Sequence, residues 1–201
     1  MATQSRRSRA FSLLEVMIVI SIMGILAGLV LPSFEPSQYD TLNSAAEVVA
    51  GDLAYARSLA VTNGDAYKLT YDLTLNRYTL THSGTNSALN ALPRTSFRSK
   101  LDSSTSQVTD LSQLPHMGAM PTLLGVVATS TVSTSITNVE FGSLGQTTQT
   151  NPTVVWLATG VTGHKRYMSV TVNPTTGLAT IGVMQAITPT IPGASSGTTG
   201  S

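Results

Sequence analysis

Hydrophobic residues follow three successive patterns along the chain, and the first is an almost unbroken apolar run. From Phe11 to Leu31, Glu15 is the only charged residue among 21. A helix of this length, rising about 1.5 Å per residue, spans roughly 30 Å, which is the thickness of the hydrocarbon core of a bilayer. The first pattern therefore predicts a membrane-spanning helix over residues 11–31.

The second pattern, over residues 32–62, has the period of an amphipathic helix. Pro32 and Pro36 interrupt the apolar run, because proline breaks the hydrogen bonding of a helix. Beyond them, apolar residues recur every three or four positions, as expected of one helix face. These positions are Leu42, Ala45, Ala46, Val49, Leu53, Ala56 and Ala60. The stripe is half alanine and predicts close packing against a sheet, and Asn63-Gly64 is a typical helix stop.

The third pattern, over residues 63–185, is the alternation of apolar and polar residues that is typical of β-strands. The predicted strands are 66–72, 77–82, 94–98, 123–128, 136–141, 154–158, 167–172 and 179–184. Residues 99–122 are rich in serine, threonine and proline and predict a long loop, and residues 186–201 predict a disordered tail. The order of elements predicts an α+β fold, in which a long N-terminal helix packs on an antiparallel β domain and spans a membrane with its first half.

Composition and charge restrict the classes of function. Only 10% of the residues are charged, against about 25% in typical soluble domains, which fits an exported β-rich protein. Arg6, Arg7 and Arg9 lie before the apolar run, and without them 8 basic and 10 acidic residues leave a charge of about −2. Nucleic acid is therefore not an expected partner. The absence of cysteine excludes disulfides, thiol catalysis and cysteine-based metal sites.

Glu15 is the unexpected residue of the apolar run, because a carboxylate inside a membrane helix costs a few kcal/mol. A cleaved secretory signal would have an apolar region of about 7–15 residues and an A-x-A-like cleavage site, whereas this run is longer and lacks a clear site of that kind. A plain signal anchor fits the length of the run but leaves Glu15 unexplained. In either case the upstream arginines would hold the N-terminus in the cytoplasm.

A third interpretation explains the glutamate. The string RAFSLLEVMIVISIMGILAGLVLP, residues 9–32, closely resembles the class III signal of type IV pilins and type II secretion pseudopilins. The resemblance implies that residues 1–10 are a basic leader, that prepilin peptidase cleaves between Ala10 and Phe11, and that Phe11 is then N-methylated. Pro32 lies where many pilins carry a helix-distorting proline. The family prefers glycine before the cleavage site, and the alanine found here is small enough for a tight peptidase pocket.

The same resemblance makes Glu15 the fifth residue of the mature chain. Its carboxylate would pair with the free amine of Phe11 in a neighbouring subunit, and the pairing would offset part of the cost of burying the charge. Leader removal exposes that amine, so cleavage and assembly would be coupled. The alternative is that Glu15, one turn inside the membrane, reaches the headgroups.

Two segments of the second half resemble the C-terminal pattern of the GspH/FimT group of pseudopilins and minor pilins: VEFGSLGQT, residues 139–147, and RYMSVTVNPTTGLATIG, residues 166–182. The resemblance implies a pilin-like fold and a minor pseudopilin at or near the tip of the type II secretion pseudopilus. Its partners would be other pseudopilins or pilins, prepilin peptidase and the bacterial inner membrane, with the β domain in the periplasm. The alternative is a FimT-like minor pilin of a type IV pilus, involved in pilus assembly or DNA uptake. A major pilin of the classical type would often carry a C-terminal disulfide, which cannot form here.

No motif predicts catalysis, a cofactor or a metal site, and an enzyme is not expected. His82, His116 and His164 are scattered without metal-ligand spacing. The string GVTGHKRY, residues 160–167, places two glycines beside Lys165 and Arg166, which makes a weak candidate for an anion contact; a hairpin loop with solvated charges is the preferred interpretation. Trp156, in an apolar strand, is expected in the core.

Overall fold

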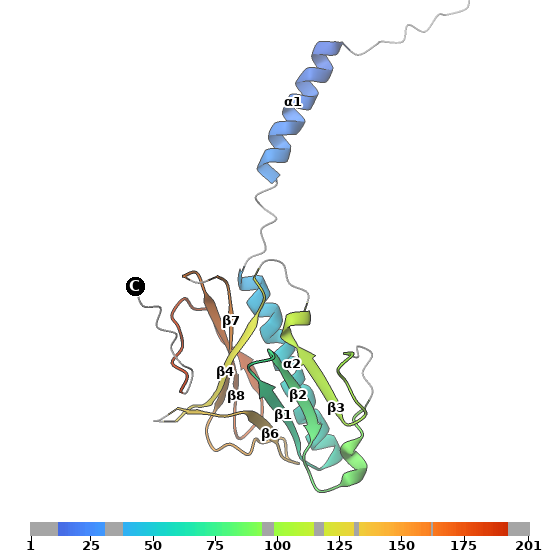
Figure 1. Cartoon of the computed structure of the whole chain (residues 1–201), viewed down its shortest axis with the longest axis vertical. Coiled ribbons are helices and arrows are strands. Elements are labelled where there is room, and N and C mark those ends of the chain that lie inside the picture. The colour runs from blue at the N-terminus through green and yellow to red at the C-terminus, as the bar shows by residue number, and fades with distance from the viewer. Residues whose placement is uncertain are drawn as a thin grey trace, which may run out of the picture. The chain divides into compact units, whose positions relative to one another are not determined.

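The computed structural model describes residues 12–30, 38–93, 99–114, 119–130, 133–161 and 163–192 (Figure 1). The chain divides into two compact units, Met1–Glu35 and Pro36–Ser201. The first contains helix α1 (Leu13–Val30), and the second contains helix α2 (Gln38–Asn63) and two antiparallel sheets. The second unit is thus an α+β domain with one helix against sheets, as the sequence predicts.

Helix α2 buries the apolar stripe that its sequence predicts. All seven predicted stripe residues are buried, and Leu59 joins them. The helix ends where the Asn63-Gly64 pair predicts, because Gly64 takes a left-handed φ of 64° and Asp65 N–H then donates to the Ala60 carbonyl at 3.2 Å. The predicted start at residue 32 cannot be compared, since residues 31–37 lie outside the described ranges.

Two sheets face the helix. In the first, the strand order is β3-β2-β1-β6, with β1 (Tyr67–Asp72), β2 (Arg77–His82), β3 (Ser106–Asp110) and β6 (Asn138–Phe141). In the second, the order is β5-β4-β7-β8-β9, with β4 (Thr122–Ala128), β5 (Thr134–Ser135), β7 (Thr153–Thr159), β8 (Arg166–Val172) and β9 (Ala179–Ile181). Two short 3-10 helices, η2 (Ser87–Asn90) and η3 (Leu111–Gln113), lie in the connections.

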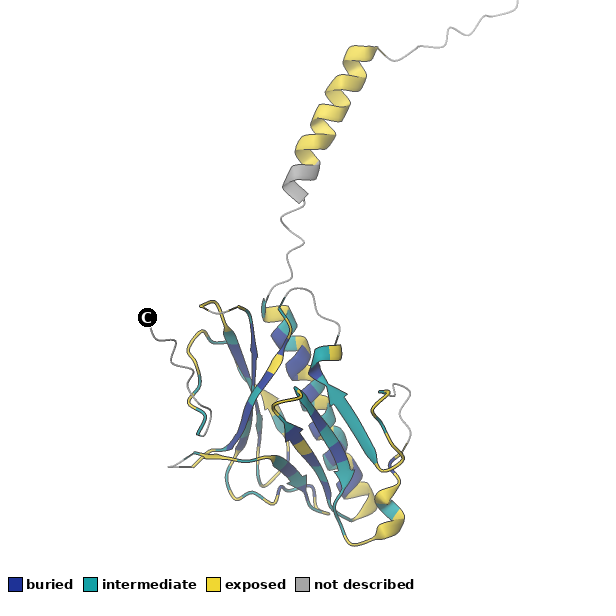
Figure 2. Cartoon of the chain, viewed as in Figure 1, coloured by how far each residue is buried: buried dark blue, intermediate teal, exposed yellow. Residues whose placement is uncertain are grey.

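The core lies between α2 and the inner faces of both sheets (Figure 2). Tyr67, Tyr78 and Phe141 are the largest fully buried side chains of the four-stranded sheet, and Leu157 and Met168 are those of the five-stranded sheet. Small alanine side chains on α2 let the strands approach the helix closely, so one helix can serve two sheets.

The prediction of a loop over residues 99–122 is wrong. Strand β3 pairs with β2 in this interval, and η3 follows it and buries Leu111. The strand has a single apolar residue, Val108, and all five of its residues are only half-buried, so it carries no alternation to detect. It is an edge strand whose Val108 N–H donates to Asp102 Oδ1 at 2.7 Å.

Other element boundaries also differ from the sequence-based expectation. Strand β9 ends at Ile181 rather than residue 184, and β5, a pair of residues on the edge of β4, was not predicted. The predicted strand 94–98 lies outside the described part of the chain.

The last described residues contact the five-stranded sheet, first at the edge of β8. Gln185 and Tyr167 exchange backbone hydrogen bonds of 2.8 and 2.9 Å, and the Tyr167 hydroxyl lies 3.1 Å from Thr188 Oγ1. Farther along, Ile191 packs against Gly125 of β4. The structure therefore differs from the predicted disordered tail over residues 186–192. Trp156, expected in the core, is half-buried and pairs with Gly125 in the strand register.

Candidate functional site

Helix α1 is apolar on every side. Val16, Met17, Ile18, Val19 and Ile20 are successive positions, 46–64% exposed in the isolated chain. Successive helical positions differ by about 100°, so these five residues cover the whole circumference. In Figure 2 the residues of the helix whose burial is described are coloured as exposed. A helix without a polar face is stable only where lipid or other apolar helices surround it.

Glu15 lies in the first turn of α1. The Ser12 carbonyl accepts hydrogen bonds from Glu15 N–H at 3.0 Å and Val16 N–H at 3.2 Å, so the chain becomes helical directly after Ser12. A carboxylate in this turn interacts favourably with the positive end of the helix dipole. Glu15 is exposed and, within the described part of the chain, forms no salt bridge. It is therefore open to a cation supplied by another molecule.

Sequence reasoning overlooked Ser12 at this site. Ser12 and Glu15 have the S-x-x-E spacing of a capping box, which marks a helix N-terminus. The spacing could have shown that α1 begins directly after Ser12, which places Glu15 in the first turn of the helix.

Several expected site residues lie outside the described ranges. Ala10, Phe11 and Pro32 are among them, and their roles in cleavage, methylation and helix distortion stay predictions. Among the helices that the structure does describe, none combines the length and hydropathy needed to cross a membrane.

The loop between β7 and β8 holds the weak anion-contact candidates. His164 N–H donates to the Val161 carbonyl at 2.9 Å, and the Arg166 guanidinium donates to the Lys165 carbonyl at 3.2 Å. Gly160 has a φ of 104°, and a Cβ there would meet the His164 carbonyl oxygen at 2.6 Å. These contacts lie in the connection between β7 and β8, where Arg166 is the first residue of β8, and an anion contact of Lys165 and Arg166 stays a prediction.

His82 belongs to a polar cluster with Asp65. Its Nε2 lies 3.1 Å from Asp65 Oδ2, and its Nδ1 lies 2.8 Å from Asn90 Oδ1. The Asp65 carboxylate also accepts the backbone N–H groups of Asn86 and Ala66, each at 2.9 Å. His116 lies outside the described residues, and among those that are described no three His, Cys, Asp or Glu side chains group as a metal site would require.

The Asp65 cluster predicts acid sensitivity of the domain. Backbone hydrogen bonds from Asn86 and Ala66, followed by the His82 contact, lower the pKa of Asp65 below its usual 3.8. A lowered folded-state pKa stabilises the fold above the unfolded pKa, and this contribution disappears as the pH falls through the folded value. Urea unfolding at pH 5 should show Asp65→Asn to be less stable than wild type, and the gap should narrow at pH 3. An equal gap at both values would contradict this account.

A second polar cluster lies between α2 and the four-stranded sheet. Asp52 Oδ2 accepts hydrogen bonds from the Tyr78 hydroxyl and Thr109 Oγ1, both at 2.7 Å. The Tyr71 ring lies 5.5 Å from that of Tyr78, and its buried hydroxyl has no hydrogen-bond partner among the described residues. Burial raises the pKa of both tyrosines, and the charge of Asp52 adds to the effect.

These two tyrosines form a matched pair for mutation. Tyr78→Phe removes a hydrogen bond to a charged group and is expected to lower the free energy of unfolding by about 1.5–3 kcal/mol. Tyr71→Phe removes a buried hydroxyl without a partner, so its effect should stay within about 0.5 kcal/mol of wild type or be stabilising. Urea denaturation of both variants checks the assignment. Equal destabilisation would show that the Asp52 bond is not the source of the difference.

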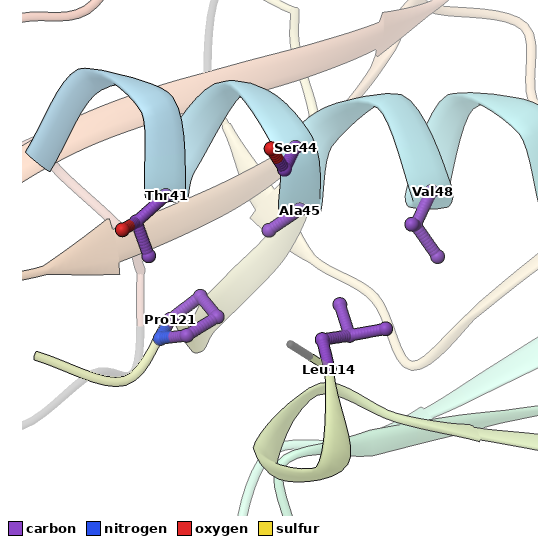
Figure 3. A pocket seen from close by; sticks show the side chains of 6 residues that line it. All are labelled: Thr41, Ser44, Ala45, Val48, Leu114 and Pro121. Atoms are coloured by element: carbon purple, nitrogen blue, oxygen red, sulfur yellow. The ribbon is translucent and has the colours of Figure 1, made fainter. Parts of the chain in front are cut away.

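A cavity of about 210 Å³ lies beside the N-terminal half of α2 (Figure 3). Its lining residues are Thr41, Ser44, Ala45, Val48, Leu114 and Pro121. The side chains facing it are aliphatic carbons and hydroxyl groups, so this lining supplies no titratable group for acid–base catalysis.

Comparison with known proteins identifies the N-terminal segment. Residues 5–31 match the family model described as the prokaryotic N-terminal methylation motif. The match confirms the resemblance to the class III signal over residues 9–31, and the chain is type IV pilin-like in this segment.

No curated protein matches the chain. Two crystal forms of the type IV minor pilin FimU of Pseudomonas aeruginosa are similar to it, at 18% and 20% sequence identity. The alignments cover 71% and 72% of this chain and 93% and 88% of FimU, each with a TM-score of 0.39.

Proposed function

We propose that this chain is a minor pseudopilin, a structural subunit at or near the tip of a type II secretion pseudopilus that helps export folded proteins. The observation that supports this proposal most is the methylation motif over residues 5–31. It includes Glu15 in the first turn of a helix that is apolar on every side. An α+β domain follows this helix in the sequence. The proposal assigns the chain a structural role without catalysis.

Processing and storage come first in the proposed mechanism. Prepilin peptidase removes residues 1–10 by cleaving between Ala10 and Phe11, and Phe11 is then methylated on its new amine. Residues 11–31 anchor the subunit in the inner membrane, with the β domain in the periplasm. The apolar side chains of α1 favour lipid, because each buried CH₂ contributes about 0.8 kcal/mol.

Assembly follows when α1 moves from lipid into a bundle with the α1 helices of neighbouring subunits. The Glu15 carboxylate of one subunit then faces the Phe11 amine of another. In an apolar bundle an unpaired charge is strongly disfavoured. A subunit in the wrong register would leave its Glu15 carboxylate without the Phe11 amine of a neighbour. One ion pair can thus fix the axial position of each subunit.

A second candidate is a FimT-like minor pilin of a type IV pilus. The methylation motif is expected of this class too, and Lys165 and Arg166 give the domain two neighbouring cations where the β7–β8 loop meets β8. Phosphate binding by two cations is weak and falls steeply with salt. Salt-dependent DNA binding that is lost in Lys165→Ala/Arg166→Ala favours this candidate, and no binding at low salt ends it.

A deletion experiment tests the proposed function. Removing the gene should abolish secretion of folded cargo while leaving surface pili intact, and the tagged wild-type chain should appear in fibre preparations at low copy number. Loss of pili with normal secretion would favour the pilus candidate. A chain that never enters fibres would overturn both.

A further inference from the structure

The five-stranded sheet has a seat for an extended segment, which residues 185–192 occupy, starting at the edge of β8 where β9 also pairs. At one end Gln185 pairs with the backbone of Tyr167 in β8, through bonds of 2.8 and 2.9 Å. In the middle, Thr188 Oγ1 lies 3.1 Å from the Tyr167 hydroxyl. At the other end Ile191 lies over β4. Backbone pairing and side-chain packing thus both hold the segment.

Gly125 forms the notch that receives Ile191. A Cβ at position 125 would lie 2.8 Å from Ile191 Cγ2 and 3.1 Å from Cδ1, closer than such atoms approach in proteins. A larger residue at position 125 would therefore force the Ile191 side chain to shift.

The segment is attached in a way that permits release. Between its anchoring residues, Ile187 is 79% exposed, and Val183, which precedes the segment, is 87% exposed. Few buried contacts are a feature of regions that open locally at low free-energy cost. The contacts at Tyr167 and Gly125 do not depend on whether the segment belongs to the same chain.

We propose that this seat also takes residues 185–192 of a second copy of the chain, so that neighbouring subunits are joined by exchange of this segment. A second copy reproduces every contact of the first, because the sequences are identical. Within one chain the segment has a high effective concentration, and a fibre or crowded membrane provides a comparable concentration between copies. The exchange goes beyond the proposed function, and it rests on the fibre or membrane setting proposed there.

Cysteine cross-linking tests the seat directly, because the wild-type chain contains no cysteine. The Cβ atoms of a disulfide lie about 3.5–4.5 Å apart. Since Ile191 Cγ2 and Cγ1 lie 2.8 and 3.7 Å from a Cβ built at position 125, a sulfur at the γ position of residue 191 comes within bonding reach. The full-length double variant Gly125→Cys/Ile191→Cys should form an intramolecular disulfide under mild oxidation.

Exchange between copies is tested by mixing two single variants, Gly125→Cys and Ile191→Cys, in lipid nanodiscs that hold more than one chain. The Cβ added in Gly125→Cys disfavours that copy's own Ile191, whereas the smaller cysteine side chain at position 191 of the other copy fits. A disulfide-linked dimer is expected at several times the yield of a control mixture of Ile191→Cys with Leu75→Cys, a variant at an exposed residue of the β1–β2 turn. Equal yields would overturn the proposal, as would failure of the double variant to form its disulfide.

Discussion

The full-length chain carrying Glu15→Ala is expected to insert into the membrane normally but to enter fibres at least tenfold less than wild type. Insertion itself should be easier, because alanine lacks the cost of a few kcal/mol that a carboxylate carries inside a membrane helix. Assembly should fail because the Phe11 amine of the neighbour would be left uncompensated in an apolar bundle. Removing one partner of such a pair costs about 3–5 kcal/mol, well above the roughly 1.4 kcal/mol that a tenfold loss requires.

Two further variants separate the charge of Glu15 from its local role in the helix. Glu15→Gln keeps a side chain suited to the first turn but loses the charge, so it should fail like Glu15→Ala if pairing between subunits is the role. Ser21→Ala, which loses only a hydroxyl bonded to the Met17 carbonyl at 2.8 Å, should assemble normally. Quantitative blots of membranes and sheared fibres measure both steps. Normal incorporation of Glu15→Gln would contradict the ion-pair account.

Gly177→Ala is expected to lower the free energy of unfolding of the domain by about 3 kcal/mol or more. Gly177 has a φ of 65° in the turn between β8 and β9, and a Cβ there would collide with the backbone carbonyl oxygen of Gly145. The neighbouring Thr176 carbonyl accepts a hydrogen bond from Arg57 Nε at 2.7 Å, so the turn is fixed to α2 and cannot move away freely. The cost of the left-handed backbone and the cost of the overlap with Gly145 should therefore add in the free energy of unfolding.

Gly64→Ala is the matched control for this prediction. Its φ of 64° is nearly the same, but no atom lies within 4 Å of the position that a Cβ would take. Only the left-handed backbone is penalised, which costs about 1 kcal/mol. Urea denaturation of the two variants should separate them by about 2 kcal/mol or more. Equal losses of unfolding free energy in the two variants would mean that the β8–β9 turn moves away from Gly145, and that the contact with Gly145 does not restrict position 177.

The elements that the sequence predicts well are those whose pattern reflects one buried face. The stripe from Leu42 to Ala60 predicts α2, and alternation predicts β1, β2, β7 and β8 to within one residue. Strand β3 escapes prediction because its neighbours, rather than its own apolar residues, hold it in place. The seat of Ile191 escapes for a similar reason, since the sequence shows neither the notch at Gly125 nor the pairing at Tyr167.

Only part of the candidate site could be predicted from the sequence. A lone carboxylate in an apolar run stands out in any sequence, so Glu15 and its setting could be predicted from the sequence alone. The cluster around Asp52 could not be predicted, because Tyr78 and Thr109 lie 26 and 57 residues away and meet the carboxylate only in the folded domain. The partner of Glu15 is expected on another copy, so that contact forms only between chains.

The central claim is that the N-terminal motif is processed so that a free amine faces a carboxylate within an apolar helix bundle. Intact mass and N-terminal sequencing of the membrane-extracted protein test this most directly. The account predicts a chain that starts at Phe11 and carries one methyl group on its amine. A chain that keeps residues 1–10 and starts at Met1 would contradict it.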